Sequence, residues 1–270
     1  MGNRKSIITL LTDFGTQDYF VGAMKGVILS LNPDATIVDI THGIPPQDIQ
    51  AAAFNLLACY RDFPADTIHV AVVDPGVGSD RRAIVIECAG QWFVGPDNGL
   101  FSWIIEQERS FSAWQIRNEK FFRNPVSSTF HGRDVFAPVA AALSNGAAPR
   151  EVGPPLESIV RLASLSPRTT ADALEGSIIH IDRFGNCITN FTAENINEER
   201  IAAGAKLIVN GQQIPSFRKF FADQDGAKDE LFMLFGSAGF VEIAAQNASA
   251  AAILSAKRGD TVLLVHDDDA

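Results

Sequence analysis

Ile7-Ile8-Thr9-Leu10-Leu11, followed at once by Thr12-Asp13-Phe14-Gly15, is the stretch that decides the fold of this 270-residue chain. The apolar run predicts a buried strand, and the polar turn with its glycine predicts where that strand ends. Residues 20–31 then carry apolar side chains at helical spacing and stop at Asn32-Pro33. A strand, a loop that carries a carboxylate, and a helix therefore follow one another.

The same alternation continues through the first half of the chain. Further strands are predicted at residues 35–40 and 67–73, a hairpin at 83–88 and 92–94, and helices at 47–59 and 134–143. Strands that alternate with helices predict an α/β domain built on a mostly parallel sheet with flanking helices. Ligands of such sheets collect beyond the carboxyl ends of the strands, where Asp13, His42 and Asp74 fall.

The second half of the chain has a different character. Several prolines between residues 147 and 168 predict a linker, and short strands are predicted at residues 177–181, 206–209, 231–234, 240–244 and 261–265. Asn210-Gly211 is a strong hairpin signal. We therefore predict an α/β domain over residues 1–165 and a smaller all-β, barrel-like domain over residues 171–270.

Composition excludes several classes of protein. Hydrophobic residues make up 46% and charged residues 20%, as in ordinary globular chains. A net charge of −10 disfavours nucleic acid and anionic membranes as partners. The three cysteines form no CxxC or Cys/His cluster, so we expect no disulfide framework and no metal site. The first apolar run is too short for a signal peptide or a membrane span, and we expect a cytoplasmic protein.

Two segments of the first domain carry more polar chemistry than a strand end needs. Asp13 can hold two vicinal ribose hydroxyls, although a turn aspartate is the simpler interpretation. Asp74 and Arg81 flank a turn with two glycines and can approach one another, but an ordinary surface ion pair would look the same. No dinucleotide fingerprint or P-loop occurs in the chain.

Two further segments leave similar alternatives open. His131, beside a glycine and just before a predicted helix, suits a residue that reaches a ligand, although a lone histidine is more often structural. Asp182, Phe184 and Asn186 combine a carboxylate, an aromatic ring and an amide around one turn. That set suits an ammonium-carboxylate ligand, and it equally suits a plain hairpin turn.

Taken together and in this order, the segments resemble one family, the S-adenosylmethionine hydroxide adenosyltransferases, which are related to the halide-using fluorinase and chlorinase. The resemblance runs from about Ile7 to Val265. It rests on the strings Leu-Thr-Asp-Phe-Gly (11–15), Asp-Ile-Thr-His (39–42), Val-Asp-Pro-Gly-Val-Gly (73–78), Gly-Pro-Asp-Asn-Gly (95–99), Phe-His-Gly-Arg-Asp (130–134), Phe-Gly-Asn (184–186) and Gly-Phe-Val-Glu-Ile-Ala (239–244).

The resemblance implies a function and a site. The activity is hydrolysis of S-adenosyl-L-methionine to adenosine and methionine, with that molecule as substrate and with no cofactor or metal. Asp74, Arg81 and His131 match the polar triad of the water-using members, and Asp13 would hold the ribose. The remaining residues implied to bind substrate are Phe130, Asp182, Phe184, Asn186, Phe221, Ser237, Ala245 and Asn247. The family also implies a homotrimer whose sites lie between one subunit's first domain and its neighbour's second.

The chain departs from the halide-using relatives at three positions. Asp74 stands where they have a tyrosine, and Gly132 stands where the fluorinase has a serine beside its fluoride. Gln47 replaces the tryptophan that the fluorinase places over the sugar, so another residue, Phe20 or Phe130, must build that wall.

The triad predicts how water would be used. Arg81 would orient the water, His131 would accept its proton and Asp74 would position both, although the sequence leaves open which of the three takes the proton. A halogenase on the same fold is disfavoured because the Asp74 carboxylate would repel a halide. A non-catalytic sensor of S-adenosylmethionine would not need the triad. Methyl transfer is disfavoured because the usual glycine-rich loop is absent.

Overall fold

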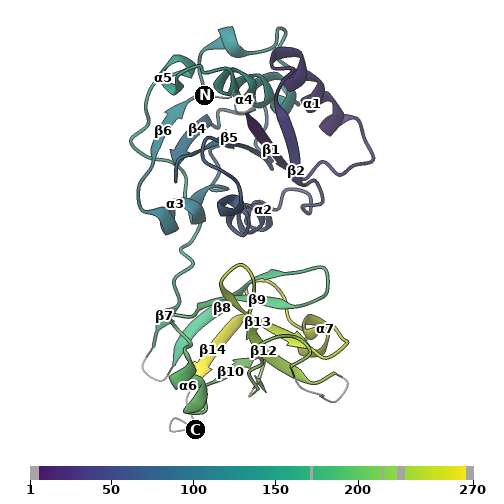
Figure 1. Cartoon of the computed structure of the whole chain (residues 1–270), viewed down its shortest axis with the longest axis vertical. Coiled ribbons are helices and arrows are strands. Elements are labelled where there is room, and N and C mark those ends of the chain that lie inside the picture. Colours follow the sequence, from purple (N-terminus) through teal and green to yellow (C-terminus); the bar gives the residue numbers. More distant parts are fainter. Residues whose placement is uncertain (1–5, 171–172, 215, 224–228, 266–270) are drawn as a thin grey trace. The chain divides into compact units, whose positions relative to one another are not determined.

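The computed structural model describes residues 6–170, 173–214, 216–223 and 229–265. The chain folds into two compact units, Met1–Ser164 and Leu165–Ala270 (Figure 1). The first unit combines a sheet with helices, and the described part of the second consists of strands and short helices. The predicted fold class is therefore confirmed.

A six-stranded sheet forms the centre of the first unit, in the order β2-β1-β3-β5-β4-β6. Its strands are β1 (Ile7–Thr12), β2 (Thr36–Thr41), β3 (Ile68–Val72), β4 (Ala83–Cys88), β5 (Gln91–Pro96) and β6 (Ser112–Gln115). The pairs among β2, β1, β3 and β5 are parallel, whereas β4 is antiparallel to both of its neighbours. Strands β4 and β5 form the predicted hairpin. The antiparallel pairs of β4 make the mostly parallel sheet a mixed one.

Helices cover both faces of this sheet. Figure 1 shows α1 (Phe20–Leu31) and α4 (Ala137–Ser144) on one face, and α2 (Ile49–Leu57) and α3 (Ser102–Glu108) on the other. Helix α1 buries Val21, Met24 and Ile28, which follow each other at three- and four-residue spacing. Burying each such side chain contributes roughly 1.5–3 kcal/mol, so this stripe holds α1 against the sheet and fixes the loop that precedes it.

Two predicted segments differ from the structure. The predicted helix at 134–143 begins earlier, as a π-helical segment, η3 (Gly132–Phe136), that runs directly into α4. The predicted linker contains α5 (Pro149–Val152), and its later part is bound to the first unit. There the indole of Trp103 donates to the carbonyl of Ala163 at 3.0 Å, and the amide of Leu162 donates to Ser102 at 2.8 Å.

The second unit is one antiparallel sheet that curls toward closure, in the order β11-β10-β14-β8-β9-β13-β12. Its strands are β8 (Leu174–Ile181), β9 (Cys187–Thr192), β10 (Lys206–Val209), β11 (Gln212–Ile214), β12 (Leu231–Phe235), β13 (Phe240–Ala245) and β14 (Thr261–Val265), with β7 (Arg168–Thr169) beside β8. The backbone after β11 hydrogen-bonds with Met233 of β12, which brings the two edges together. The short helices α6 (Glu198–Ala202) and α7 (Ala250–Leu254) complete the unit.

Turn chemistry explains two hairpins of this sheet. Asn210 and Gly211 both have positive φ, 49° and 78°, as a two-residue hairpin turn between β10 and β11 requires. Gly185 has φ of 84°, and a Cβ there would meet the Ser249 hydroxyl at 2.0 Å. Only glycine fits that turn, which joins β8 to β9 and carries Asp182.

Candidate functional site

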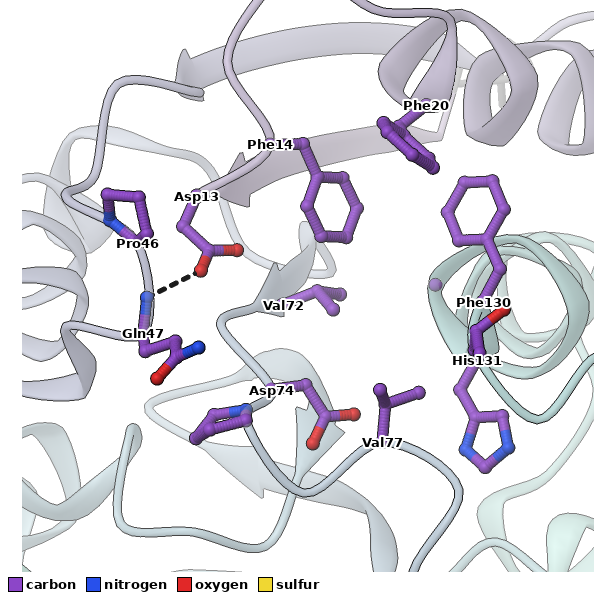
Figure 2. Close-up of a pocket in the computed structure, with 13 residues that line it drawn as sticks. Asp13, Phe14, Phe20, Pro46, Gln47, Val72, Asp74, Val77, Phe130 and His131 are labelled. Carbon is purple, nitrogen blue, oxygen red and sulfur yellow. Dashed lines mark hydrogen bonds between the residues drawn. The ribbon is translucent and has the colours of Figure 1, made fainter.

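A cavity of about 440 Å³ lies at the carboxyl ends of the first unit's parallel strands (Figure 2). We call it the front cavity. Its wall is formed by Asp13, Phe14, Phe20, Pro46, Gln47, Val72, Asp74, Pro75, Val77, Thr129, Phe130, His131 and Gly132. The loops after β1 and β3 and the start of η3 supply most of these residues. The volume is within the range of small-molecule sites.

Asp13 is fixed at one side of the front cavity. Its Oδ2 accepts a hydrogen bond from the backbone amide of Gln47 at 2.8 Å. Gln47 has a positive φ of 66°, an uncommon conformation for a residue with a side chain. The loop after β2 is therefore held in a strained conformation in which the Gln47 amide points at the Asp13 carboxylate. A carboxylate held in this way is suited to accept hydrogen bonds from two neighbouring hydroxyls.

Three phenyl rings form the opposite wall of the front cavity (Figure 2). Phe130 lies edge-on to Phe14 and Phe20, with ring centroids 5.9 and 5.2 Å away. Arg133 lies 5.0 Å from the Phe130 ring centroid and bonds Asp134, so the Phe130 ring is supported from behind. An aromatic wall is thus present even though Gln47 stands where the fluorinase has tryptophan.

A buried polar network behind Asp13 was not predicted. The hydroxyl of Thr12 bonds His42 Nδ1 at 2.8 Å and accepts the amide of Phe14 at 3.2 Å. His42 Nε2 lies 3.1 Å from Asp39, which also binds Lys25. The network ties the turn that carries Asp13 to β2. The sequence strings at 11–15 and 39–42 contain residues of this network, so each indicated part of it. The sequence could not pair these residues, because their contact depends on the register of β1 and β2.

Asp74, Arg81 and His131 come together beside the front cavity. Arg81 Nε donates to Asp74 Oδ1 at 2.9 Å, and its Nη2 donates to Asp74 Oδ2. The same Nη2 lies 2.8 Å from His131 Nδ1. Side chains 50 positions apart in sequence therefore form one hydrogen-bonded group. Asp74 and His131 line the cavity, whereas Arg81 lies behind them.

The hydrogen bond from Arg81 determines the tautomer of His131. A guanidinium has only donors, so His131 Nδ1 is the acceptor and the neutral ring carries its proton on Nε2. Burial, and then the positive charge of Arg81, lower the pKa of His131 below its ordinary value of 6.5. The ring is therefore neutral at pH 7, and Nε2 is a donor while the Arg81 bond persists. The group that can accept a proton from a water in the cavity is then the Asp74 carboxylate.

The string at 95–99 supports this group from the end of β5 and the turn that follows it. The side chain of Asn98 donates to the carbonyl of Val73 at 2.8 Å, next to Asp74. Asp97 accepts from Arg82 Nε at 2.7 Å, next to Arg81. Gly78 has φ of 79°, and a Cβ there would meet the Ser128 carbonyl at 2.3 Å. The turn between Asp74 and Arg81 thus packs directly on the backbone that leads to His131.

In the second unit, Asp182 and Asn186 form one rigid turn. Asp182 Oδ1 accepts from the amides of Phe184 and Asn186 at 2.9 and 2.8 Å, and its Oδ2 accepts from the Asn186 side chain at 2.9 Å. Phe184 projects from the turn with 78% of its surface exposed. The segment is therefore a hairpin turn, and it also presents an oriented carboxylate and an exposed ring.

The other predicted residues of the second unit are less closely grouped. Phe221 is half exposed and packs edge-on against Phe232 at 6.2 Å. Ser237 is exposed in the turn between β12 and β13. Ala245 ends β13, and Asn247 follows it with φ of 52°.

Glu242 is a site candidate that sequence reasoning missed, although it lies in the string at 239–244. It packs so closely on Gly236 that a Cβ there would meet its Oε1 at 1.8 Å. Burial, and then the negative charge of Asp182, raise the pKa of Glu242 above its ordinary value. Two carboxylates thus lie within electrostatic reach of one another, an arrangement that favours a cationic ligand.

Across the described residues, no group of three or more His, Cys, Asp and Glu side chains is placed to hold a metal ion. No helix within those residues has the length and apolar character that crossing a membrane requires.

Comparison with known proteins finds family matches over both units of the chain. Residues 8–153 match the SAM hydroxide adenosyltransferase N-terminal domain, and residues 176–263 match the C-terminal domain of the same family. An (R)-S-adenosyl-L-methionine hydrolase of Thermus thermophilus is 37% identical over 268 residues, which cover 96% of this chain and 99% of the relative. The hydrolase of Methanocaldococcus jannaschii is also 37% identical, over 96% of each chain.

A fluorinase and a solved structure extend the comparison. The fluorinase of an Actinoplanes species is 28% identical, over 96% of this chain and 97% of the relative. A crystal structure of an uncharacterised conserved protein from Thermotoga maritima superposes with a TM-score of 0.89 at 36% identity. It covers 96% of this chain and all of the other.

Proposed function

Because this chain belongs to the SAM hydroxide adenosyltransferase family, we propose that it hydrolyses S-adenosyl-L-methionine to adenosine and L-methionine. The observation that carries the proposal is the group formed by Asp74, Arg81 and His131 at the wall of the front cavity, which also holds Asp13. The substrate needs no cofactor for this reaction, because its sulfonium is already a good leaving group.

The reaction is an in-line displacement at C5′ of the ribose. The water oxygen bonds to C5′ while the C5′–S bond breaks and its electron pair returns to sulfur, which becomes the neutral thioether of methionine. One proton leaves the attacking water. Water is a poor nucleophile with a pKa near 15.7, so the protein must orient it and accept that proton.

The triad divides these tasks according to its hydrogen bonds. His131 donates from Nε2 to the water oxygen and holds it in place, and Asp74 accepts the proton as the oxygen attacks. Arg81 holds Asp74 and His131 in position and stabilises the Asp74 carboxylate before the reaction. Asp13 accepts hydrogen bonds from the ribose hydroxyls, and Phe14, Phe20 and Phe130 pack against the nucleoside.

The second unit supplies the rest of the substrate contacts in this proposal. Its carboxylates suit the ammonium of the methionine part, and its amide, hydroxyl and backbone groups suit the carboxylate and the adenine edge. The residues assigned to these contacts are Asp182, Phe184, Asn186, Phe221, Ser237, Ala245 and Asn247.

A halide-using reaction fits this chain less well. Asp74 places a negative charge where the nucleophile must enter, and an anion there would be repelled. The named hydrolases are also more similar to this chain, at 37% identity, than the named fluorinase, at 28%.

We further propose a cytoplasmic homotrimer with sites between neighbouring subunits. The family resemblance supports this assembly, and so does the division of the predicted substrate contacts between two units. Three free thiols, two of them buried, agree with a reducing compartment.

Product analysis tests the proposed function. The protein is incubated with S-adenosyl-L-methionine in ¹⁸O-water, with and without chloride and fluoride, and the nucleoside is identified by mass. We expect adenosine labelled at the 5′ oxygen under every condition. A 5′-halogenated nucleoside, or an unchanged substrate, would refute the proposal.

A further inference from the structure

A second cavity, of about 260 Å³, lies behind the Asp74–Arg81–His131 group, and the mechanism above does not use it. We call it the rear cavity. Arg81, Arg82, Gln115 and Glu119 line it together with His131, and five apolar residues, Val126 among them, form the rest of its wall. Among the described residues of the two walls, His131 is common to both cavities, whereas Asp74 lines the front cavity and Arg81 the rear one.

The charges of the rear cavity suit water and protons better than an anion. Both guanidiniums on its wall already have carboxylate partners, because Arg81 is paired with Asp74 and Arg82 with Asp97. Those pairs cancel most of the positive charge. Glu119 is exposed and lies at the start of the helical turn η2 (Glu119–Phe121).

The reaction creates a need for such a space. Each turnover releases one proton while substrate or its two products occupy the front cavity. A proton left on Asp74 would weaken the ion pair with Arg81 and the arrangement that the next turnover requires. A path that does not pass through the front cavity would let the proton leave before the products do.

We propose that the rear cavity is the exit for this proton and the reservoir for the attacking water. A chain of hydrogen-bonded water molecules runs from Glu119 past His131 to Asp74. The water nearest Asp74 is the attacking one and accepts from His131 Nε2, and the proton taken up by Asp74 returns to solvent along the waters behind it. The inference rests on the proposed hydrolysis.

Filling the rear cavity tests the proposal. Val126 is on its wall with 43% of its surface exposed, so Val126→Trp adds bulk at little cost to the core. Leu29→Trp, at an equally exposed position on α1 that lines neither cavity, is the matched control. In single-turnover experiments, rapid quench measures adenosine formation and a pH indicator measures the proton. A parallel run coupled to adenosine deaminase measures the release of adenosine.

In the wild type and in Leu29→Trp, we expect the proton to reach solvent together with adenosine formation and before adenosine release. In Val126→Trp, we expect proton release to slow at least about tenfold and to coincide with adenosine release. Proton release that keeps pace with chemistry in Val126→Trp, or that waits for product release in the wild type, would overturn the inference. If Val126→Trp does not fold, Glu119→Gln takes its place, and Glu87→Gln, at an exposed position of β4, is its control. We then expect proton release to be delayed in Glu119→Gln alone, and proton release that keeps pace with adenosine formation in this variant would overturn the inference.

The two proposals fail differently. If the wild type forms no adenosine, the proposed hydrolysis is wrong. If it forms adenosine but filling the rear cavity leaves the proton's timing unchanged, only the exit path is wrong.

Discussion

Arg81 is the residue on which the candidate water site depends most. Its guanidinium holds both oxygens of Asp74 and Nδ1 of His131 at once. A lysine has one ammonium on a flexible stem and cannot reproduce this planar set of donors. The tautomer of His131, and with it the donor that faces the water, therefore depends on Arg81.

Arg81→Lys and His131→Ala should each lower kcat by roughly 10²–10⁴-fold, the usual loss when proton transfer is no longer organised. The affinity for substrate should change much less, because Asp13 and the second unit still bind it. Stopped assays at saturating substrate give kcat, and calorimetry with a non-reactive analogue gives Kd. Arg150→Lys, at an exposed position of α5, is the control. Full turnover by His131→Ala would remove the triad from the mechanism.

Glu242 and Asp182 make a second prediction at the residue scale. The raised pKa of Glu242 comes from burial and then from the charge of Asp182, and the ammonium of the substrate would relieve that repulsion. Only the ionised form of Glu242 attracts a cation. Substrate affinity should therefore be full above the raised pKa and fall as the pH drops through it, at a higher pH than for an ordinary glutamate.

Glu242→Gln should weaken substrate binding by roughly tenfold near neutral pH, the usual scale for a hydrogen bond to a charged group. It should also abolish this pH dependence. Calorimetric titrations between pH 5 and 8, as a convenient range, measure both effects. Glu199→Gln, at an exposed position of α6, should behave like the wild type. A Glu242→Gln protein that keeps both the affinity and its pH dependence would exclude Glu242 from the site.

Strand β3 carries a buried histidine that links the central strands of the first unit. His69 Nδ1 bonds Thr9 of β1 at 2.8 Å, and Nε2 lies 3.3 Å from Gln91 Oε1 at the start of β5. The two N–H groups of the Gln91 side chain are shared among three backbone carbonyls, so its Oε1 accepts and His69 Nε2 donates. Burial lowers the pKa of His69 to about 4. The uncharged His69 ring thus links β3 to its two neighbouring strands, β1 and β5.

The sign of the resulting pH dependence follows from linkage. Between pH 6.5 and about 4 the unfolded chain binds a proton at His69 and the folded chain does not. The stabilisation is complete above pH 6.5 and is lost as the pH falls toward 4, by about 3 kcal/mol in all. Urea unfolding followed by tryptophan fluorescence reports the first unit alone, because Trp92, Trp103 and Trp114 all lie there. His69→Gln should flatten this part of the pH profile, and an unchanged slope would contradict the assignment.

Elements whose signals are local were predictable from the sequence. Helix α1 matches its predicted bounds, because apolar spacing and Asn32-Pro33 specify both its face and its end. Strand β9 was missed because Thr189 and Asn190 interrupt its apolar pattern. Their buried side chains bond the carbonyls of Val241 and Leu165, which only the folded sheet brings near.

Elements and contacts that depend on distant pairing were not predictable. Helix α3 spans seven residues, too few for a clear period. The contact of Arg81 with His131 requires η3, whose wider turns no local pattern predicts. The family resemblance nevertheless implied that Asp74, Arg81 and His131 form one polar triad. The Thr12–His42 network and the rear cavity needed the packed structure.

At the scale of the whole chain, the proposed substrate contacts are divided between two compact units. The front cavity holds Asp13, Asp74 and His131 of the first unit, and Asp182 with Asn186 lies in the second. A homotrimer with sites between subunits predicts that one substrate is bound by the first unit of one copy and the second unit of a neighbour. That prediction can be tested with pairs of inactive proteins.

Asp74→Ala should inactivate the first unit's part of each site, and Asp182→Ala should inactivate the second unit's part. If sites lie between subunits, co-expressed or co-refolded 1:1 mixtures contain sites built from the intact part of each protein. With random assembly, about one quarter of all sites combine the two intact parts, so we expect about one quarter of the wild-type activity. A mixture of Asp74→Ala with Arg81→Ala is the matched control and should stay inactive, because both changes damage the same unit. Sedimentation of the wild type should give the mass of three chains. An active monomer at every dilution, or a mixed sample no more active than its parents, would show that each chain builds its site alone.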